Sequence, residues 1–253
     1  MKLYHYTKIE NLTSIVQKDG LSFWLTDYRE FDDPSEGELI LKVQQQFYPK
    51  WVYNNIERYV LSLSRRHDNL AMWREYANNA TGLVLEIETN NVKPSIFSLL
   101  LECDYSDKTI KERSEAVKNI CDEYGKIDAA IKYGDYCKRF PDLEPEDLKD
   151  FNEKLAVMDA SVELIRVKNA CYSYEEEIRY IVKAFDAEKF HYYIKNGKLR
   201  KCYEFNMNKN ALTKIYVGSN NNSSILSDIK KYLDVIHLSD IDVEMMDLPY
   251  RTR

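Results

Sequence analysis

The chain has 253 residues, of which 44% are apolar and 13% aromatic, and this predicts one large globular domain rather than a disordered chain. Its formal net charge of −6 argues against broad, non-specific binding to nucleic acid or anionic membranes. The sequence has no apolar run long enough to span a membrane, no metal-site spacing among its five cysteines and no glycine-rich phosphate loop, so we expect a cytoplasmic protein with reduced thiols.

The N-terminal third reads as short strands alternating with helices. Strands are expected at residues 3–6, 21–26, 59–64 and 82–88. Thr7-Lys8-Ile9-Glu10 matches a capping box, which predicts a helix after Thr7 that ends with Gly20 as its C-terminal cap. A second helix is expected at residues 70–77, capped by Asp68 or Asn69.

A polar loop follows the second predicted strand and contains Asp32, Asp33 and Glu36. Their carboxylates could bind a metal ion through oxygen ligands. Acids are also favoured at a helix N-terminus, and a helix from Ser35 to about Phe47 fits the pattern, so the turn-and-helix interpretation is preferred.

A helical insertion is predicted at about residues 106–167, between two halves of a sheet. Apolar residues recur at spacings of three and four between positions 148 and 165, which indicates an amphipathic helix. Strands follow at 171–180, 201–206, 212–217 and 242–248, and a helix begins at Ser223 or Ser224. The order favours an α+β fold with a mixed or antiparallel sheet, formed by a single domain over residues 1–253.

The strand predicted at 171–180 carries the most unusual pattern. Alternate residues of a strand share a face, so Glu175, Glu177 and Arg179 are expected on one side and the apolar residues on the other. Burying two acids and a base is unfavourable unless they are paired or used in function. If the first strand were a neighbour, His5 and Thr7 would line the same cleft; the alternative is a cross-strand ladder of ion pairs on a solvent face.

Several short motifs together resemble a bacterial family catalogued as a domain of unknown function. They are Leu3-Tyr4-His5-Tyr6-Thr7, Phe31-Asp32-Asp33-Pro34-x-Glu36, Leu61-x-Leu63-Ser64, Met72-Trp73-x-x-Tyr76, Gly82 to Ile87, and Tyr174-Glu175-x-Glu177-Ile178-Arg179.

A looser similarity concerns His5-x-Thr7, the aromatic residues after it and the late Glu175-x-Glu177. This set is similar to the His-Tyr-Glu signature of diphtheria-toxin-like ADP-ribosyltransferases, a family with a split mixed or antiparallel sheet and flanking helices. The resemblance implies an enzyme that uses NAD as a substrate, acts on a protein or nucleic-acid target, and serves as a toxin or phage-defence effector with a possible antitoxin partner and no membrane role.

The same resemblance implies roles for individual residues. Glu177 would stabilise the oxocarbenium-like state at the nicotinamide ribose, and Glu175 would orient or deprotonate the acceptor. The implied NAD contacts are His5 on the adenosine ribose, the backbone near Tyr6 and Thr7 on the nicotinamide amide, Arg179 near the pyrophosphate, and an aromatic stacked on nicotinamide, with Trp24, Tyr28 and Trp73 as candidates.

Two other functional hypotheses remain open from the sequence. The same fold without catalysis would bind a nucleotide or dock a partner. A metal-dependent hydrolase or nuclease built on Asp32, Asp33 and Glu36 ranks third.

Overall fold

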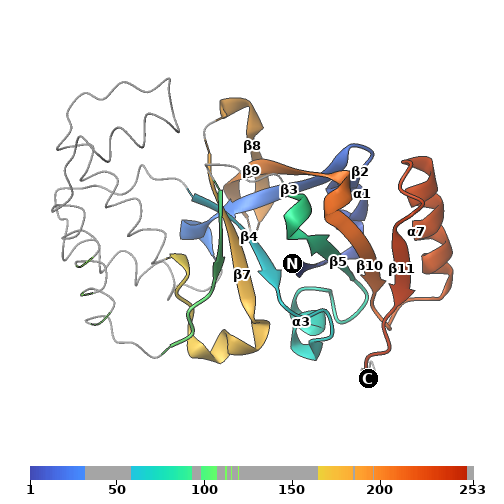
Figure 1. Ribbon diagram of the computed structural model, residues 1–253, viewed down its shortest axis with the longest axis horizontal. Coiled ribbons are helices and arrows are strands. Elements are labelled where there is room, and N and C mark those ends of the chain that lie inside the picture. The colour runs from blue at the N-terminus through green and yellow to red at the C-terminus, as the bar shows by residue number, and fades with distance from the viewer. Residues whose placement is uncertain are drawn as a thin grey trace. The chain divides into compact units, whose positions relative to one another are not determined.

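The computed structural model (Figure 1) describes most of the chain outside residues 32–57 and the greater part of 107–164. The described residues are 1–31, 58–92, 98–106, 112, 115, 119, 165–184, 186–195 and 197–249. The chain divides into two compact units: the first contains Met1–Asp27, Arg58–Cys103 and Cys171–Arg253, and the second contains Tyr28–Glu57 and Asp104–Ala170.

The first unit is built on an 11-stranded sheet with the order β11-β10-β5-β1-β4-β3-β9-β8, to which β2, β6 and β7 are added. The strands are β1 (Lys2–Thr7), β2 (Val16–Gln17), β3 (Gly20–Asp27), β4 (Arg58–Ser64), β5 (Leu83–Glu88), β6 (Ser98–Glu102), β7 (Glu177–Lys183), β8 (Phe190–Lys195), β9 (Lys198–Asn208), β10 (Leu212–Val217) and β11 (Asp242–Met245). Among the described ladders β10–β11 is parallel and the others are antiparallel, so the prediction of a mixed or antiparallel sheet is confirmed.

Strand β4 has three neighbours and splits the sheet. One of its edges pairs with β7 over its whole length, from Arg58↔Lys183 to Ser64↔Glu177. Its other edge pairs with β3 at Tyr59 and Val60 but with β1 at Ser64. We call the intervening stretch of β4, Leu61–Leu63, the fork.

The two faces of the sheet differ in chemistry. One face, here the core face, carries Leu3, His5, Leu63 and Ile178, and most of its side chains belong to a single buried apolar cluster. Helices α1 (Leu12–Ile15) and α7 (Ser224–Val235) contribute apolar side chains to this cluster, and Figure 1 shows α7 beside β11.

The other face, here the polar face, carries Tyr4, Ser62, Ser64, Glu177 and Arg179. Part of it is covered by α3 (Leu70–Glu75), whose Met72 and Trp73 pack in a second apolar cluster. The predicted α3 is confirmed, and Asn69 is its cap, because the Asn69 side chain accepts hydrogen bonds from the backbone N–H groups of Ala71 and Met72.

Two local predictions near the N-terminus are wrong. Thr7 is the last residue of β1 and caps no helix; its Oγ1 accepts a hydrogen bond from Asn11 Nδ2 at 3.0 Å, and short 3-10 and α turns follow. Gly20 opens β3 rather than ending a helix. Its φ is +148°, and a Cβ there would lie 2.0 Å from the Met207 carbonyl oxygen, so close strand approach requires the glycine.

Within the second unit, the described residues form a 3-10 turn at Tyr28–Glu30 and a parallel bridge between Asp104 and Val167. The predicted helices over 35–47 and 148–165, and most of the predicted insertion, lie outside the described residues. Among those described, no helix combines the length and apolar character needed to cross a bilayer.

Candidate functional site

The alternation predicted for the late strand is confirmed from Glu177 onward. Glu177 lies opposite Ser64, and Arg179 lies opposite Ser62, so both charged side chains point to the polar face. Ile178, Tyr180 and Val182 point the other way and belong to the apolar cluster. Strand β4 separates β7 from β1, so the first strand and the late strand are not neighbours.

Glu175 is not part of this strand, and the prediction of a strand at 171–176 is wrong. Residues Ala170–Glu175 form a 3-10 helix, and Glu176 has a φ of +43°, in the left-handed region. Two hydrogen bonds fix this turn: Ser64 Oγ donates to the Glu175 carbonyl at 2.7 Å, and the Arg65 N–H donates to the Glu176 carbonyl at 3.1 Å. Glu175 nevertheless remains buried, as Glu177 does.

Glu177 and Arg179 form a bidentate ion pair. Arg179 Nε donates to Glu177 Oε1 and Arg179 Nη2 donates to Glu177 Oε2, both at 3.1 Å. The side chains are 3% and 2% exposed, respectively, and the Cys103 thiol lies 3.4 Å from Oε2. Two parallel hydrogen bonds fix the plane of the carboxylate and compensate its charge inside the protein.

Tyr76, the residue that ends α3, reaches Glu175. Its phenol donates to Glu175 Oε1 at 2.8 Å. Burial and the nearby carboxylates of Glu175 and Glu177 raise the pKa of Tyr76, so the phenol stays protonated and remains a donor at neutral pH. Tyr76 therefore faces both acids of the late motif.

Further hydrogen bonds tie α3 to the turn before β7. Tyr174 donates from its phenol to Glu75 Oε2 at 2.9 Å, and Asn69 Nδ2 donates to the Tyr174 carbonyl. Three consecutive residues after α3, Asn78 to Ala80, have positive φ values of 48°, 54° and 59°. This left-handed turn follows Tyr76 and ends the helix.

The structure does not bring His5 and Thr7 to the acids. Tyr4 lies opposite Ser64, and Ser64 lies opposite Glu177, so these three side chains share the polar face. His5 and Thr7 follow Tyr4 in β1 by one and three residues, so their side chains point to the core face. The His5 side chain lies against the fork. Its Nδ1 lies 3.2 Å from the Ser62 carbonyl, and its ring packs edge-on against Phe23. Burial lowers the pKa of His5 to about 4, so the ring is neutral at pH 7 and can donate to this carbonyl from Nδ1.

The aromatic candidates lie in different environments. Tyr6 is buried, packs against Trp73, and donates to the Arg66 carbonyl at 2.8 Å. Trp73 is fully buried, with its Nε1 donating to the His67 carbonyl at 2.7 Å. Trp24 is exposed on the polar face of β3, while Tyr28 belongs to the second unit.

The metal hypothesis concerns Asp32, Asp33 and Glu36, which lie outside the described residues. Within the part of the chain that the structure describes, no group of three or more His, Cys, Asp or Glu side chains could hold a metal ion.

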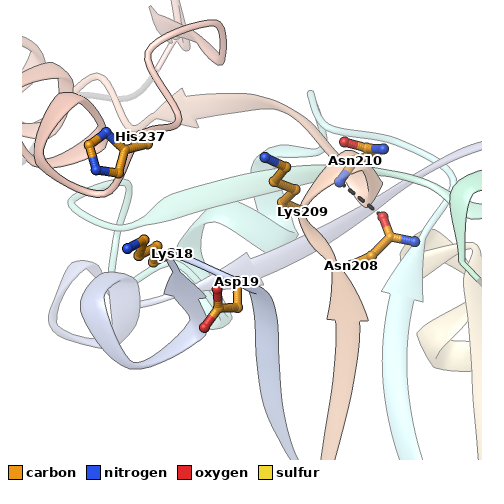
Figure 2. A pocket seen from close by; sticks show the side chains of 6 residues that line it. All are labelled: Lys18, Asp19, Asn208, Lys209, Asn210 and His237. Atoms are coloured by element: carbon orange, nitrogen blue, oxygen red, sulfur yellow. Dashed lines mark hydrogen bonds between the residues drawn. The ribbon is translucent and has the colours of Figure 1, made fainter.

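An open cavity of about 530 Å³ lies elsewhere on the first unit (Figure 2). It is lined by Lys18, Asp19, Asn208, Lys209, Asn210 and His237. None of the predicted site residues lines it, so it is separate from the cluster around Glu177.

Sequence reasoning missed three members of that cluster: Tyr76, Ser64 and Cys103. Two of them stand in motifs already recognised, Met72-Trp73-x-x-Tyr76 and Leu61-x-Leu63-Ser64. A shared family pattern was therefore the available signal, while the pairing of those motifs with Tyr174 to Arg179 required the structure.

Residues 72–180 match the model of a family described as a protein of unknown function (DUF2971). The match supports the resemblance to a domain-of-unknown-function family over this stretch, which contains Tyr76, Glu175, Glu177 and Arg179. No curated protein and no solved structure matches the chain.

Proposed function

We propose that the protein is an NAD-dependent ADP-ribosyltransferase that modifies a protein or nucleic-acid acceptor. One observation carries the proposal: Glu175 and Glu177 flank a left-handed Glu176 and are held, buried, by Tyr76 and Arg179 at the start of β7. Orienting two carboxylates in this way is unfavourable for stability alone, and such sites are candidates for catalysis.

In the proposed reaction the bond between nicotinamide nitrogen and ribose C1′ breaks, and its electron pair leaves with nicotinamide. The ribose gains oxocarbenium character, which the Glu177 carboxylate stabilises through a ribose hydroxyl. The acceptor nucleophile then forms the new bond to C1′ and gives its proton to Glu175. Arg179 and Tyr76 hold these carboxylates in place.

This proposal gives His5 and Thr7 no contact with the reacting ribose, because they point to the core face. His5 instead supports the fork, through its contact with the Ser62 carbonyl.

A second candidate is a nucleotide-binding module without turnover. The low exposure of Glu177 and Arg179 favours it, because a bidentate pair that is 3% and 2% exposed also suits a purely structural role.

The test is nicotinamide release from NAD by wild type and Glu177→Gln, with and without cell lysate as a source of acceptor. We expect release by wild type, stimulated by lysate, and a loss of about 100-fold or more in the variant. Glu86→Gln is the matched control, because Glu86 is also a buried, hydrogen-bonded carboxylate on the sheet, bound by Lys2 and Tyr216.

Equal release by wild type and Glu177→Gln would contradict the site assignment. NAD binding without release, in the presence of lysate, would favour the binding module. A protein that binds no NAD would exclude the transferase, and one that binds neither NAD nor ADP-ribose would count against both candidates.

A further inference from the structure

The hairpin formed by β8 and β9 gathers several basic residues on one face. Its register is His191↔Cys202, Tyr193↔Arg200 and Lys195↔Lys198. Directly opposed residues of an antiparallel pair share a face, and so do alternate residues of one strand. His191, Tyr193, Lys195, Lys198 and Arg200 therefore share one face of the hairpin.

Trp24 extends this row onto β3. It lies opposite Glu204, which is on the same face of β9 as Cys202. The indole reaches over to His191 and stacks on its ring, with 4.9 Å between centroids and planes inclined by 7°. Trp24 is still 54% exposed, so much of its surface is open to solvent.

Glu204 holds the stacked histidine in place. His191 Nε2 lies 2.8 Å from Glu204 Oε2, while Asn206 and Ser22 donate to Oε1 at 2.9 Å and 3.4 Å. Hydrogen bonds, first from Asn206 and then from His191, keep the pKa of Glu204 below its ordinary value. Glu204 thus orients the His191 ring beneath Trp24 before any ligand arrives, and we call this stacked pair the platform.

The cations extend from this platform toward the turn. Lys195 and Lys198 are directly opposed, so two cations lie side by side next to the turn of the hairpin. Arg200 lies between this pair and the platform, opposite Tyr193. The exposed apolar residues Tyr192, Ile194 and Leu199 are on the reverse face.

We propose that this row, Trp24, His191, Tyr193, Arg200, Lys195 and Lys198, binds single-stranded nucleic acid. Aromatic rings that take stacked bases, combined with cations spaced along a backbone, are the two components of such sites. The exposed indole of Trp24 would take a base, and the lysines would contact phosphates. The inference is independent of the NAD chemistry and stands or falls without it.

The test measures fluorescence anisotropy of labelled oligothymidine and oligouridine with the full chain. Wild type should bind, and Trp24→Ala should weaken binding by about five- to 100-fold, the loss of one stacked base. Trp24→Phe should restore most of the affinity. Lys198→Gln should lower the slope of log affinity against log salt by about 0.7, the effect of one phosphate contact.

Tyr192→Ala is the matched control, because Tyr192 is an aromatic residue, 60% exposed, on the reverse face of the same strand. It should leave affinity unchanged. Binding of either oligonucleotide with this variant pattern supports the proposal, and a preference for oligouridine over oligodeoxyuridine, which differ only at the 2′ position, would identify RNA through its 2′-hydroxyl.

Three results would overturn the proposal: no oligonucleotide binding at low salt, equal losses in Trp24→Ala and Tyr192→Ala, or binding to vesicles of anionic phospholipid in place of oligonucleotides.

Discussion

Removing Arg179 tests whether the acids are held by the buried ion pair. Arg179→Met removes both hydrogen bonds of the bidentate pair from Glu177, whose side chain is 3% exposed in the wild type. Breaking a buried pair from one side costs about 3–5 kcal/mol, because the remaining charge loses its charge-assisted hydrogen bonds in a low-dielectric interior. For a chain of this size each kcal/mol shifts the melting temperature by about 2–4 °C, so we expect a fall of roughly 6–20 °C.

The double variant Glu177→Leu/Arg179→Met separates stability from chemistry. Replacing both partners by apolar side chains of similar volume is near neutral, so this variant should regain most of the lost stability. It should still release no nicotinamide, because the proposed catalytic carboxylate is missing. Urea unfolding of wild type, both single variants and the double variant gives the coupling energy directly.

The reasoning is refuted if each single variant costs less than about 1 kcal/mol, or if the double variant is no more stable than Arg179→Met. Either result would mean that solvent or other groups compensate the charges. A double variant that is stable and still releases nicotinamide would refute the catalytic role of Glu177. The ion pair of the wild type would then have a structural role only.

Three further changes probe the surrounding structure. Tyr76→Phe removes one hydrogen bond to buried Glu175 and should cost about 1–3 kcal/mol in urea unfolding; an unchanged midpoint would count against this hydrogen bond. His5 has a pKa of about 4 in the folded protein and about 6.5 in the unfolded chain. Neutral His5 therefore contributes fully to the free energy of unfolding above pH 6.5, and this contribution, at most about 3 kcal/mol, is lost as the pH falls toward 4. His5→Asn should reduce the difference in unfolding free energy between pH 7 and pH 4.5, and an identical pH dependence would exclude a protonation-sensitive fork. Glu176→Val should cost roughly 1–3 kcal/mol because valine tolerates a φ of +43° poorly, whereas Glu176→Gly should be tolerated; equal melting temperatures would argue against a left-handed turn there.

The sequence predicted the central strands well, because their apolar residues alternate and turn residues bound them. Residues 59–64, 82–88 and 212–217 coincide closely with β4, β5 and β10. β8 was missed: Phe190–Lys195 is a short strand at an edge of the sheet, and Tyr193, an aromatic residue on the same face as His191 and Lys195, weakens the period-two alternation.

The side of the sheet on which a residue lies depended on register and could not be predicted. Glu177 and Arg179 follow from alternation within one strand. The position of His5 relative to them depends on two pairings, Tyr4↔Ser64 and Ser64↔Glu177, between segments far apart in the chain. A shift of one residue in the register of either pairing would move His5 to the polar face. No local sequence pattern determines which face His5 takes relative to Glu177.

The partners of the acids were hidden for a related reason. Tyr76 reaches Glu175 across about a hundred positions of sequence, at a helix end set by the left-handed turn at Asn78 to Ala80. Local propensity describes α3 and the strand separately, and only tertiary packing joins them.

The connectivity of the sheet also constrains how the protein is made. β3 lies against β9, with Gly20 beside Asn208, and β5 lies against β10, with Leu83 beside Val217. During synthesis the N-terminal strands therefore emerge long before their partners, and the sheet cannot close until most of the chain has left the ribosome. Until then β3, β4 and β5 each have an edge that lacks its final partner strand. Correct folding in the cell therefore requires that these edges do not associate with other chains before the later strands have been synthesised.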